Sequence, residues 1–222
     1  MVASYHIDAS KYSLRKMKAD LLNRDLIPSQ IPLKEGLEEK FRNLDEAGLD
    51  TLQELILALK NKKKLKELAL TTGIDENYLT LLRREANSYL PNPVSLEKFS
   101  GFLEGDVKQL AALGIKNSRQ LFESIESDAD LDSLARETDI RRDTLATLWG
   151  LSDLVRAYGV GPVFARILYD TGIQSIRIFR SSTPRQIIGL YQEKTNQKAD
   201  FTISDLAFSL EIVKVLDIGV EK

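Results

Sequence analysis

One pattern recurs at a fixed distance in this sequence and constrains the fold more than any other feature. The segment AGLDTLQELI at residues 47–56 resembles LGIKNSRQLF at residues 113–122: each places a glycine and an aliphatic residue before a short polar stretch and an apolar pair. A third and less regular copy, TGIQSIRIFR, occupies residues 171–180. The sequence therefore predicts three related units.

The first two units stay in register well beyond these segments. An offset of 66 residues continues without gaps for about 35 residues and pairs apolar positions with apolar positions. The pairs include Leu65 with Leu131, Leu68 with Leu134, Ile74 with Ile140, Leu79 with Leu145, and Leu82 with Leu148. The third copy begins 58 residues after the second, since Gly172 follows Gly114 by that distance.

Apolar residues within each unit follow the period of an α-helix. Leu37, Phe41 and Leu44 lie at positions i, i+4 and i+7, and no segment of strand length alternates between apolar and polar residues. Residues that commonly cap the start of a helix precede several of these stripes, at Asp75, Ser118, Thr183 and Ser204. The predicted fold is all-α and consists of tandem helical repeats joined by short loops.

The prolines of LPNPVS at residues 90–95 interrupt the helical pattern and mark the best internal boundary. We expect residues 1–92 to hold an N-terminal arm and the first repeat unit. Residues 93–222 are expected to hold the second and third units.

The composition excludes several kinds of chemistry. The chain has no cysteine and one histidine, His6, so disulfides, zinc–thiolate sites and the usual nucleophile–base pairs cannot be assembled. We therefore expect no enzyme activity, no catalytic or metal-binding residues, no cofactor and no small-molecule substrate. The N-terminus lacks the apolar core of a signal peptide and no run reaches transmembrane length, so we expect a cytoplasmic protein without a membrane partner.

Other features have two interpretations each. The lysine-rich stretch LKNKKKLK at residues 59–66 is either a contact surface or a solvated connector, and the second is favoured because the register matches it with the acidic ESDADLDS. The acidic stretch lacks the glycine and terminal glutamate of a calcium loop. Trp149 is either a partner anchor or a packing residue between units, and packing is the more common role.

The sequence GVGP at residues 159–162 lies between two helical stripes. Gly159 is placed to end the first helix, Gly161 to cap the second, and Pro162 to occupy its first position. Such a turn leaves backbone N–H groups unpaired at a helix N-terminus, where they can receive a phosphate oxygen. Candidate contacts are Gly159, Val160 and Gly161, with Arg156 and Arg166 as counter-charges. The alternative is a structural turn between solvated arginines.

The stretch LSDLVRAYGVGPVFARILYDTGI, residues 151–173, resembles the helix-hairpin-helix motif of DNA-binding proteins that do not read sequence. The resemblance implies that hairpin amides grip phosphates, commonly through paired motifs. The corresponding positions of the other units have no compact Gly-x-Gly, and Val163 and Phe164 stand where such proteins commonly have basic residues. Over its whole length the chain resembles a bacterial family of helix-hairpin-helix repeats catalogued as a domain of unknown function.

Two functional hypotheses follow. The first is a module that binds nucleic acid, DNA in particular, through the hairpin, weakly and without sequence specificity. It is supported by a local charge of +3 over residues 151–200, which contrasts with −4 over residues 93–150. The second is a protein-interaction or scaffolding module in which the hairpin is only structural.

Overall fold

The computed structural model describes residues 3–218 as helices joined by turns. Within these residues, strand-like pairing is limited to two isolated bridges, Ser13 with Thr51 and Ser95 with Asn117, and the predicted all-α class is confirmed. No helix among them is long and apolar enough to cross a bilayer. The elements are α1 (Leu14–Asn23), η1 (Pro28–Lys34), α2 (Leu37–Glu46), α3 (Leu52–Ala58), α4 (Lys62–Thr72), α5 (Glu76–Ser88), η2 (Leu96–Lys98), α6 (Glu104–Ala112), α7 (Ser118–Ser124), α8 (Asp128–Thr138), α9 (Arg142–Leu154), α10 (Pro162–Asp170), α11 (Ile176–Ser181), α12 (Pro184–Thr195) and α13 (Ile203–Val213).

The chain divides into two compact units. The N-terminal unit is Ile7–Leu90, and the C-terminal unit consists of Pro91 onward together with the residues that precede Ile7. The division falls between Leu90 and Pro91, at the start of the proline-containing segment. The start of the chain nevertheless packs with the C-terminal unit, because Tyr5 and His6 bond to Ser118 and Pro91.

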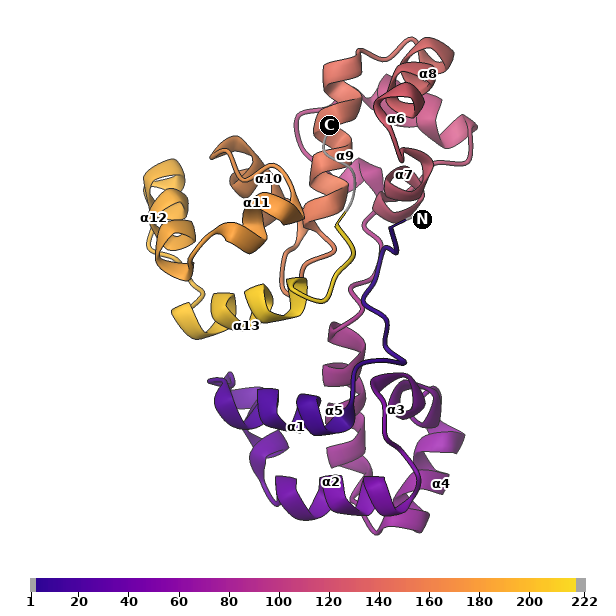
Figure 1. Cartoon of the computed structure of the whole chain (residues 1–222), viewed down its shortest axis with the longest axis vertical. Helices are drawn as coiled ribbons and strands as arrows, with labels where there is room; N and C mark the ends of the chain where they lie inside the picture. The colour runs from indigo at the N-terminus through magenta and orange to yellow at the C-terminus, as the bar shows by residue number, and fades with distance from the viewer. Residues whose placement is uncertain (1–2, 219–222) are drawn as a thin grey trace. The chain divides into compact units, whose positions relative to one another are not determined.

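The N-terminal unit is built around α5. This helix packs against α3, α4 and η1, while α1 packs against α2 (Figure 1). A buried ion pair joins the end of α1 to α5: Arg24 Nη2 lies 2.6 Å from Glu85 Oε1, and both side chains are less than a tenth exposed. Leu55, Leu79 and Leu82 are completely buried between these helices.

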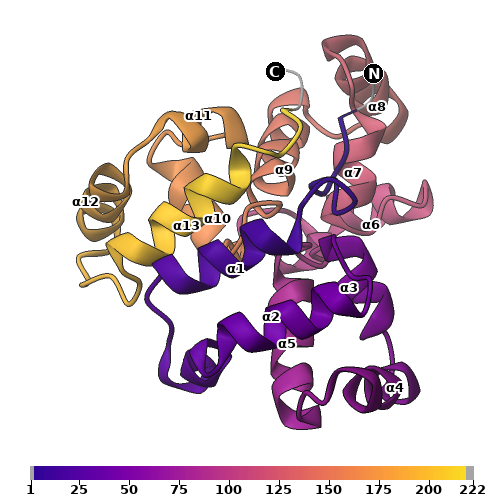
Figure 2. The ribbon, with the colours of Figure 1, turned by 60° about the horizontal axis from the view of Figure 1, so that its bottom comes forward.

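In the C-terminal unit α9 holds the central position. Helices α7 and α8 pack on one side of it, and α10 and α11 pack on the other, as both views of the chain show (Figures 1 and 2). Helix α13 covers α11 and α12 and ends close to α9. Helix α9 is buried continuously from Leu148 to its last residue, Leu154, so it forms the core of this unit.

Helix bounds repeat at the intervals found in the sequence. The bounds of α4 (62 and 72) and α8 (128 and 138) differ by 66, and so do those of α5 and α9. The bounds of α6 and α10 differ by 58. Leu68 and Leu134 are both buried with 8% exposure, and Thr72 and Thr138 each donate a 2.7 Å hydrogen bond to the backbone oxygen four residues earlier.

Two of the four predicted helix starts are confirmed, at Asp75 and Thr183, whose side chains accept backbone N–H groups of α5 and α12. The other two were wrong by one or two residues. Asn117 caps α7 in place of Ser118, and Thr202 caps α13 in place of Ser204. In both cases a residue slightly earlier in the chain has the extended backbone and the side-chain oxygen that a cap needs.

Candidate nucleic-acid interface

The hairpin at residues 159–162 is a tight connection between α9 and α10. Gly159 has a φ of +76°, in the left-handed region that favours glycine, and Gly161 caps α10 with Pro162 as its first residue. Helix α9 ends at Leu154, however, and not at Gly159 as predicted. Short-range bonds from the amides of Arg156 and Ala157 to Asp153 and Leu154 continue the chain as turns after the helix.

Two backbone donors of the hairpin lack a protein acceptor in the described chain. Within residues 3–218 no protein oxygen accepts a hydrogen bond from the amide of Gly159 or Gly161, and no side chain caps α10. A Cβ atom built on either glycine would meet nothing within 4 Å. Val160 between them is 6% exposed, so its side chain anchors the turn while both glycines lie on the outside. An anion can therefore approach these donors closely.

Arg156 occupies a different environment from the one predicted. Both sequence interpretations treat it as an exposed charge, but it is 1% exposed. Its Nε donates to the Tyr5 carbonyl at 3.0 Å, and its Nη2 donates to the carbonyls of Ser4 and Asp217 at 3.0 and 2.6 Å. The guanidinium also lies 4.0 Å from the centre of the Phe122 ring. The prediction that Arg156 contacts a phosphate is thus wrong, because its guanidinium is buried and all three of its nitrogens already donate hydrogen bonds inside the protein.

Asp153 completes this buried cluster. Its carboxylate forms an ion pair with Arg156 Nη1 and accepts a 2.7 Å bond from the amide of Ile176 at the start of α11. Burial raises the pKa of this carboxyl, and the neighbouring guanidinium opposes the shift. Asp153 and Arg156 therefore tie the base of the hairpin to α11 and to both ends of the described chain.

Helix α13 holds the hairpin from another side. Ser209 is 3% exposed and donates a 2.7 Å hydrogen bond to the carbonyl of Tyr158, the residue before Gly159. The rings of Tyr158 and Phe208 meet edge to face at 4.7 Å. Asp153 and Ser209 position the hairpin, and neither is predicted as a site residue from the sequence. Only the i, i+3 spacing of Asp153 and Arg156 offered a signal for the first.

Arg166 is the more accessible of the two predicted arginines. Its side chain is 30% exposed, and its Nε lies 2.9 Å from Asp170 Oδ1 on the same helix. The guanidinium also reaches the loop before α6. A Cβ atom added to Gly101 in this loop would lie 3.3 Å from Arg166 Nη1. Arg166 and Val163, which is 74% exposed, lie one helical turn apart on the outer face of α10.

Carboxylates distinguish this hairpin from the two at corresponding places. Gly36 before α2 and Gly101 before α6 also have positive φ angles, of +59° and +88°. The first turn of α2 contains Glu38 and Glu39, and that of α6 contains Glu104 and Asp106, whereas the first turn of α10 has no acidic residue. Since a nearby carboxylate repels an anion, α10 is the most suitable of the three for a phosphate.

The remaining candidate residues have structural roles. Trp149 is 4% exposed and stacks on Phe122 of α7 with ring centres 5.7 Å apart, so it is a packing residue, although this contact lies within the second predicted unit and not between units. In the acidic stretch, Asp128 and Asp132 form ion pairs with Arg142 at 2.6 and 2.7 Å. No group of three acidic or histidine side chains in residues 3–218 is arranged to hold a metal ion.

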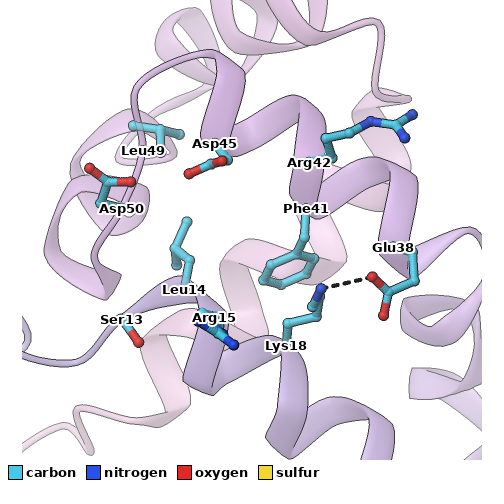
Figure 3. A pocket seen from close by; sticks show the side chains of 10 residues that line it. All are labelled: Ser13, Leu14, Arg15, Lys18, Glu38, Phe41, Arg42, Asp45, Leu49 and Asp50. Atoms are coloured by element: carbon cyan, nitrogen blue, oxygen red, sulfur yellow. Dashed lines mark hydrogen bonds and ion pairs between the residues drawn. The ribbon is translucent and has the colours of Figure 1, made fainter.

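A groove between α1 and α2 in the N-terminal unit has a lining of apolar and charged residues (Figure 3). Leu14, Phe41 and Leu49 form its apolar part, and Lys18 pairs with Glu38 across one end at 2.7 Å. Its other charged lining residues are of both signs: Arg15, Arg42, Asp45 and Asp50. Three basic and three acidic residues line the groove, so its charge favours neither an anionic nor a cationic ligand.

Most of the C-terminal unit matches the model of a protein family. A family model matches residues 100–213, just over half of the chain, from the loop before α6 to the end of α13. The chain belongs to the family described as Domain of unknown function (DUF4332). The DUF4332 match contains the hairpin at residues 159–162 and its supports Asp153, Arg156 and Ser209, but not the N-terminal unit. No curated protein and no solved structure matches the chain.

Proposed function

We propose that the C-terminal unit binds nucleic-acid phosphates without sequence specificity through the hairpin at residues 159–162. The observation that carries this proposal is the pair of outward glycines whose amides have no protein acceptor among residues 3–218, at a helix start free of carboxylates. Val163 and Phe164 add two further amides of the first helical turn. Contacts to the backbone of a nucleic acid position a protein but carry no base information.

The proposal includes a helix-hairpin-helix interpretation of the fold. We infer that α2–α5, α6–α9 and α10–α13 are three copies of one unit, supported by the repeated helix bounds and the matching burial of Leu68 and Leu134. Each copy starts with a hairpin that contains a positive-φ glycine. Of the three hairpins, the one before α10 then has the accessible anion site. Of the two predicted arginines, Arg166 is the one able to assist it, because Arg156 is buried.

Fluorescence anisotropy of a labelled duplex tests the proposal. Gly161→Val is the informative variant because Gly161 has extended backbone, with φ −85° and ψ 174°, and free space for a side chain. The fold should therefore tolerate valine, whereas the methyl groups should keep a phosphate away from the amides. We expect at least a tenfold loss of affinity at low salt, since about two or three phosphates are contacted.

Gly189→Val on α12 is the matched control, because a Cβ there also meets nothing within 4 Å. It should leave binding unchanged, and the melting temperatures of both variants should stay close to that of the wild type. If Gly161→Val is folded and binds duplex and single-stranded DNA as well as the wild type does, the hairpin is not the contact.

A protein-interaction module is the second candidate, favoured by two exposed apolar side chains beside hairpins. Leu103 before α6 is 73% exposed, and Val163 on α10 is 74% exposed. A phosphate contact makes no use of these side chains, whereas a protein partner would bury them. Leu103→Ser with Val163→Ser should thus leave nucleic-acid binding intact if the first proposal holds.

A further inference from the structure

Helix α4 in the N-terminal unit begins with an unusual concentration of positive charge. Lys62, Lys63 and Lys64 are its first three residues, Lys60 precedes them and Lys66 follows. All five side chains are exposed, and residues 57–72 contain one carboxylate, Glu67. We call these five residues the lysine patch.

Nothing in the described chain neutralises the lysine patch. Among the ion pairs of residues 3–218, none involves a residue of the patch. In the other basic run of this unit, residues 11–24, three side chains do form ion pairs: Lys11 with Asp8, Lys18 with Glu38, and Arg24 with Glu85. The lysine patch is therefore available to an external partner.

The patch also stands where a helix disfavours positive charge. The N-terminus of a helix carries a partial positive charge from its unpaired N–H groups, so lysines in the first turn are repelled by it and by one another. The corresponding helix α8 has the favourable arrangement, with Asp128 and Asp130 in its first turn. An anionic partner would relieve this repulsion in α4.

The shape of the patch suits an extended polyanion. Leu65, Leu68 and Thr72 bury one face of α4, which leaves Lys63 and Lys66 on the outer face, a helical turn apart. The five helical residues from Lys62 to Lys66 span about 7 Å, and a duplex presents one phosphate charge per about 1.7 Å of its length. A single small anion would meet only one or two of the five lysines.

A lipid surface fits these observations less well. Helices that bind a membrane surface typically combine basic side chains with apolar ones that enter the lipid. The apolar face of α4 is buried in the protein, and only Leu70, which is 88% exposed, projects outward from the helix. We propose that the lysine patch is a second nucleic-acid contact, which binds the phosphate backbone by charge alone. For the class of ligand, this inference rests on the proposed function.

Salt dependence of duplex binding by the full chain provides the test. Each lost lysine–phosphate contact reduces the slope of log K against log salt by about 0.9. The triple variant Lys62→Gln, Lys63→Gln and Lys64→Gln should thus have a slope that is shallower by about 2.7. The wild type should bind more tightly than this variant at 50 mM salt, and this advantage in affinity should fall about 40-fold when the salt is raised to 200 mM. The matched control removes three paired charges of the same unit, Lys11→Gln, Lys18→Gln and Arg42→Gln, and should change the slope by less than one.

The outcomes separate this inference from the proposed function. If the triple lysine variant keeps the wild-type slope while Gly161→Val loses binding, the lysine patch is overturned and the hairpin stands. If the slope changes while Gly161→Val binds normally, the hairpin fails and the patch stands. Binding to vesicles of phosphatidylserine and phosphatidylcholine that depends on Leu70, without any binding to duplex, would replace the nucleic acid by a lipid surface and overturn both.

Discussion

Arg156 shows how one residue can change its apparent role between sequence and structure. Its side chain is buried and gives its donors to Ser4, Tyr5, Asp153 and Asp217. A charge of this kind costs desolvation energy and is retained only when its partners are well placed. Its role is therefore to hold the base of the hairpin.

Arg156→Ala should strongly destabilise the C-terminal unit. Removal of one member of a buried ion pair leaves the other charge without compensation and typically costs about 3–5 kcal/mol. Arg166→Ala is the control, because Arg166 is partly exposed and its pair with Asp170 should contribute less than about 1 kcal/mol. Urea unfolding followed by circular dichroism measures both, and equal losses of less than about 1 kcal/mol would contradict the structural role of Arg156.

No local pattern could reveal the burial of Arg156. Its carbonyl partners lie 151 and 152 residues away at Tyr5 and Ser4, and 61 residues away at Asp217. The sequence shows only that an acidic residue precedes Arg156 by three positions, a spacing that also fits an ion pair on an exposed helix surface. The glycines were predictable because a compact Gly-x-Gly before proline has a geometric reason of its own.

At the scale of elements, the helical periodicity of the sequence predicts where the helices lie better than it predicts which side chains are in contact. The fixed offset of 66 residues anticipated the shared bounds of α4 and α8 and the burial of Leu68 and Leu134. Helix ends were less predictable, because neighbouring residues such as Asn117 and Ser118 can both cap a helix and tertiary contacts decide between them. The end of α9 was missed for a related reason, since turns continue the chain beyond it.

Truncation of the repeated leucines tests their equivalence. Leu68→Ala and Leu134→Ala should each lower the free energy of unfolding by about 2–5 kcal/mol, because both side chains fill the interior beside α5 and α9. Leu70→Ala on the exposed face of α4 is the control and should change stability by less than about 0.5 kcal/mol. Losses that differ between the two buried sites by more than about 3 kcal/mol would argue against equivalent positions.

At the scale of the whole molecule, the chain is nearly neutral, with a net charge of −2, so it has no overall attraction for a polyanion. Its two proposed contacts are local and lie in different units: the hairpin in the C-terminal unit and the lysine patch in the N-terminal unit. Two weak contacts on one chain can bind a long polyanion more tightly than either alone. The expected ligand is therefore an extended nucleic acid and not a short oligonucleotide.

The most direct measurement is an NMR titration of the amide-labelled full chain with a DNA duplex at low salt. We predict that the amide resonances of Gly159, Gly161, Val163 and Phe164 shift together with the bound fraction, because these N–H groups meet the phosphate. Buried Arg156 should show little change in its side-chain resonance. If duplex binds while these four amides remain unshifted, or if no resonance changes at all, the hairpin is not a phosphate-binding site.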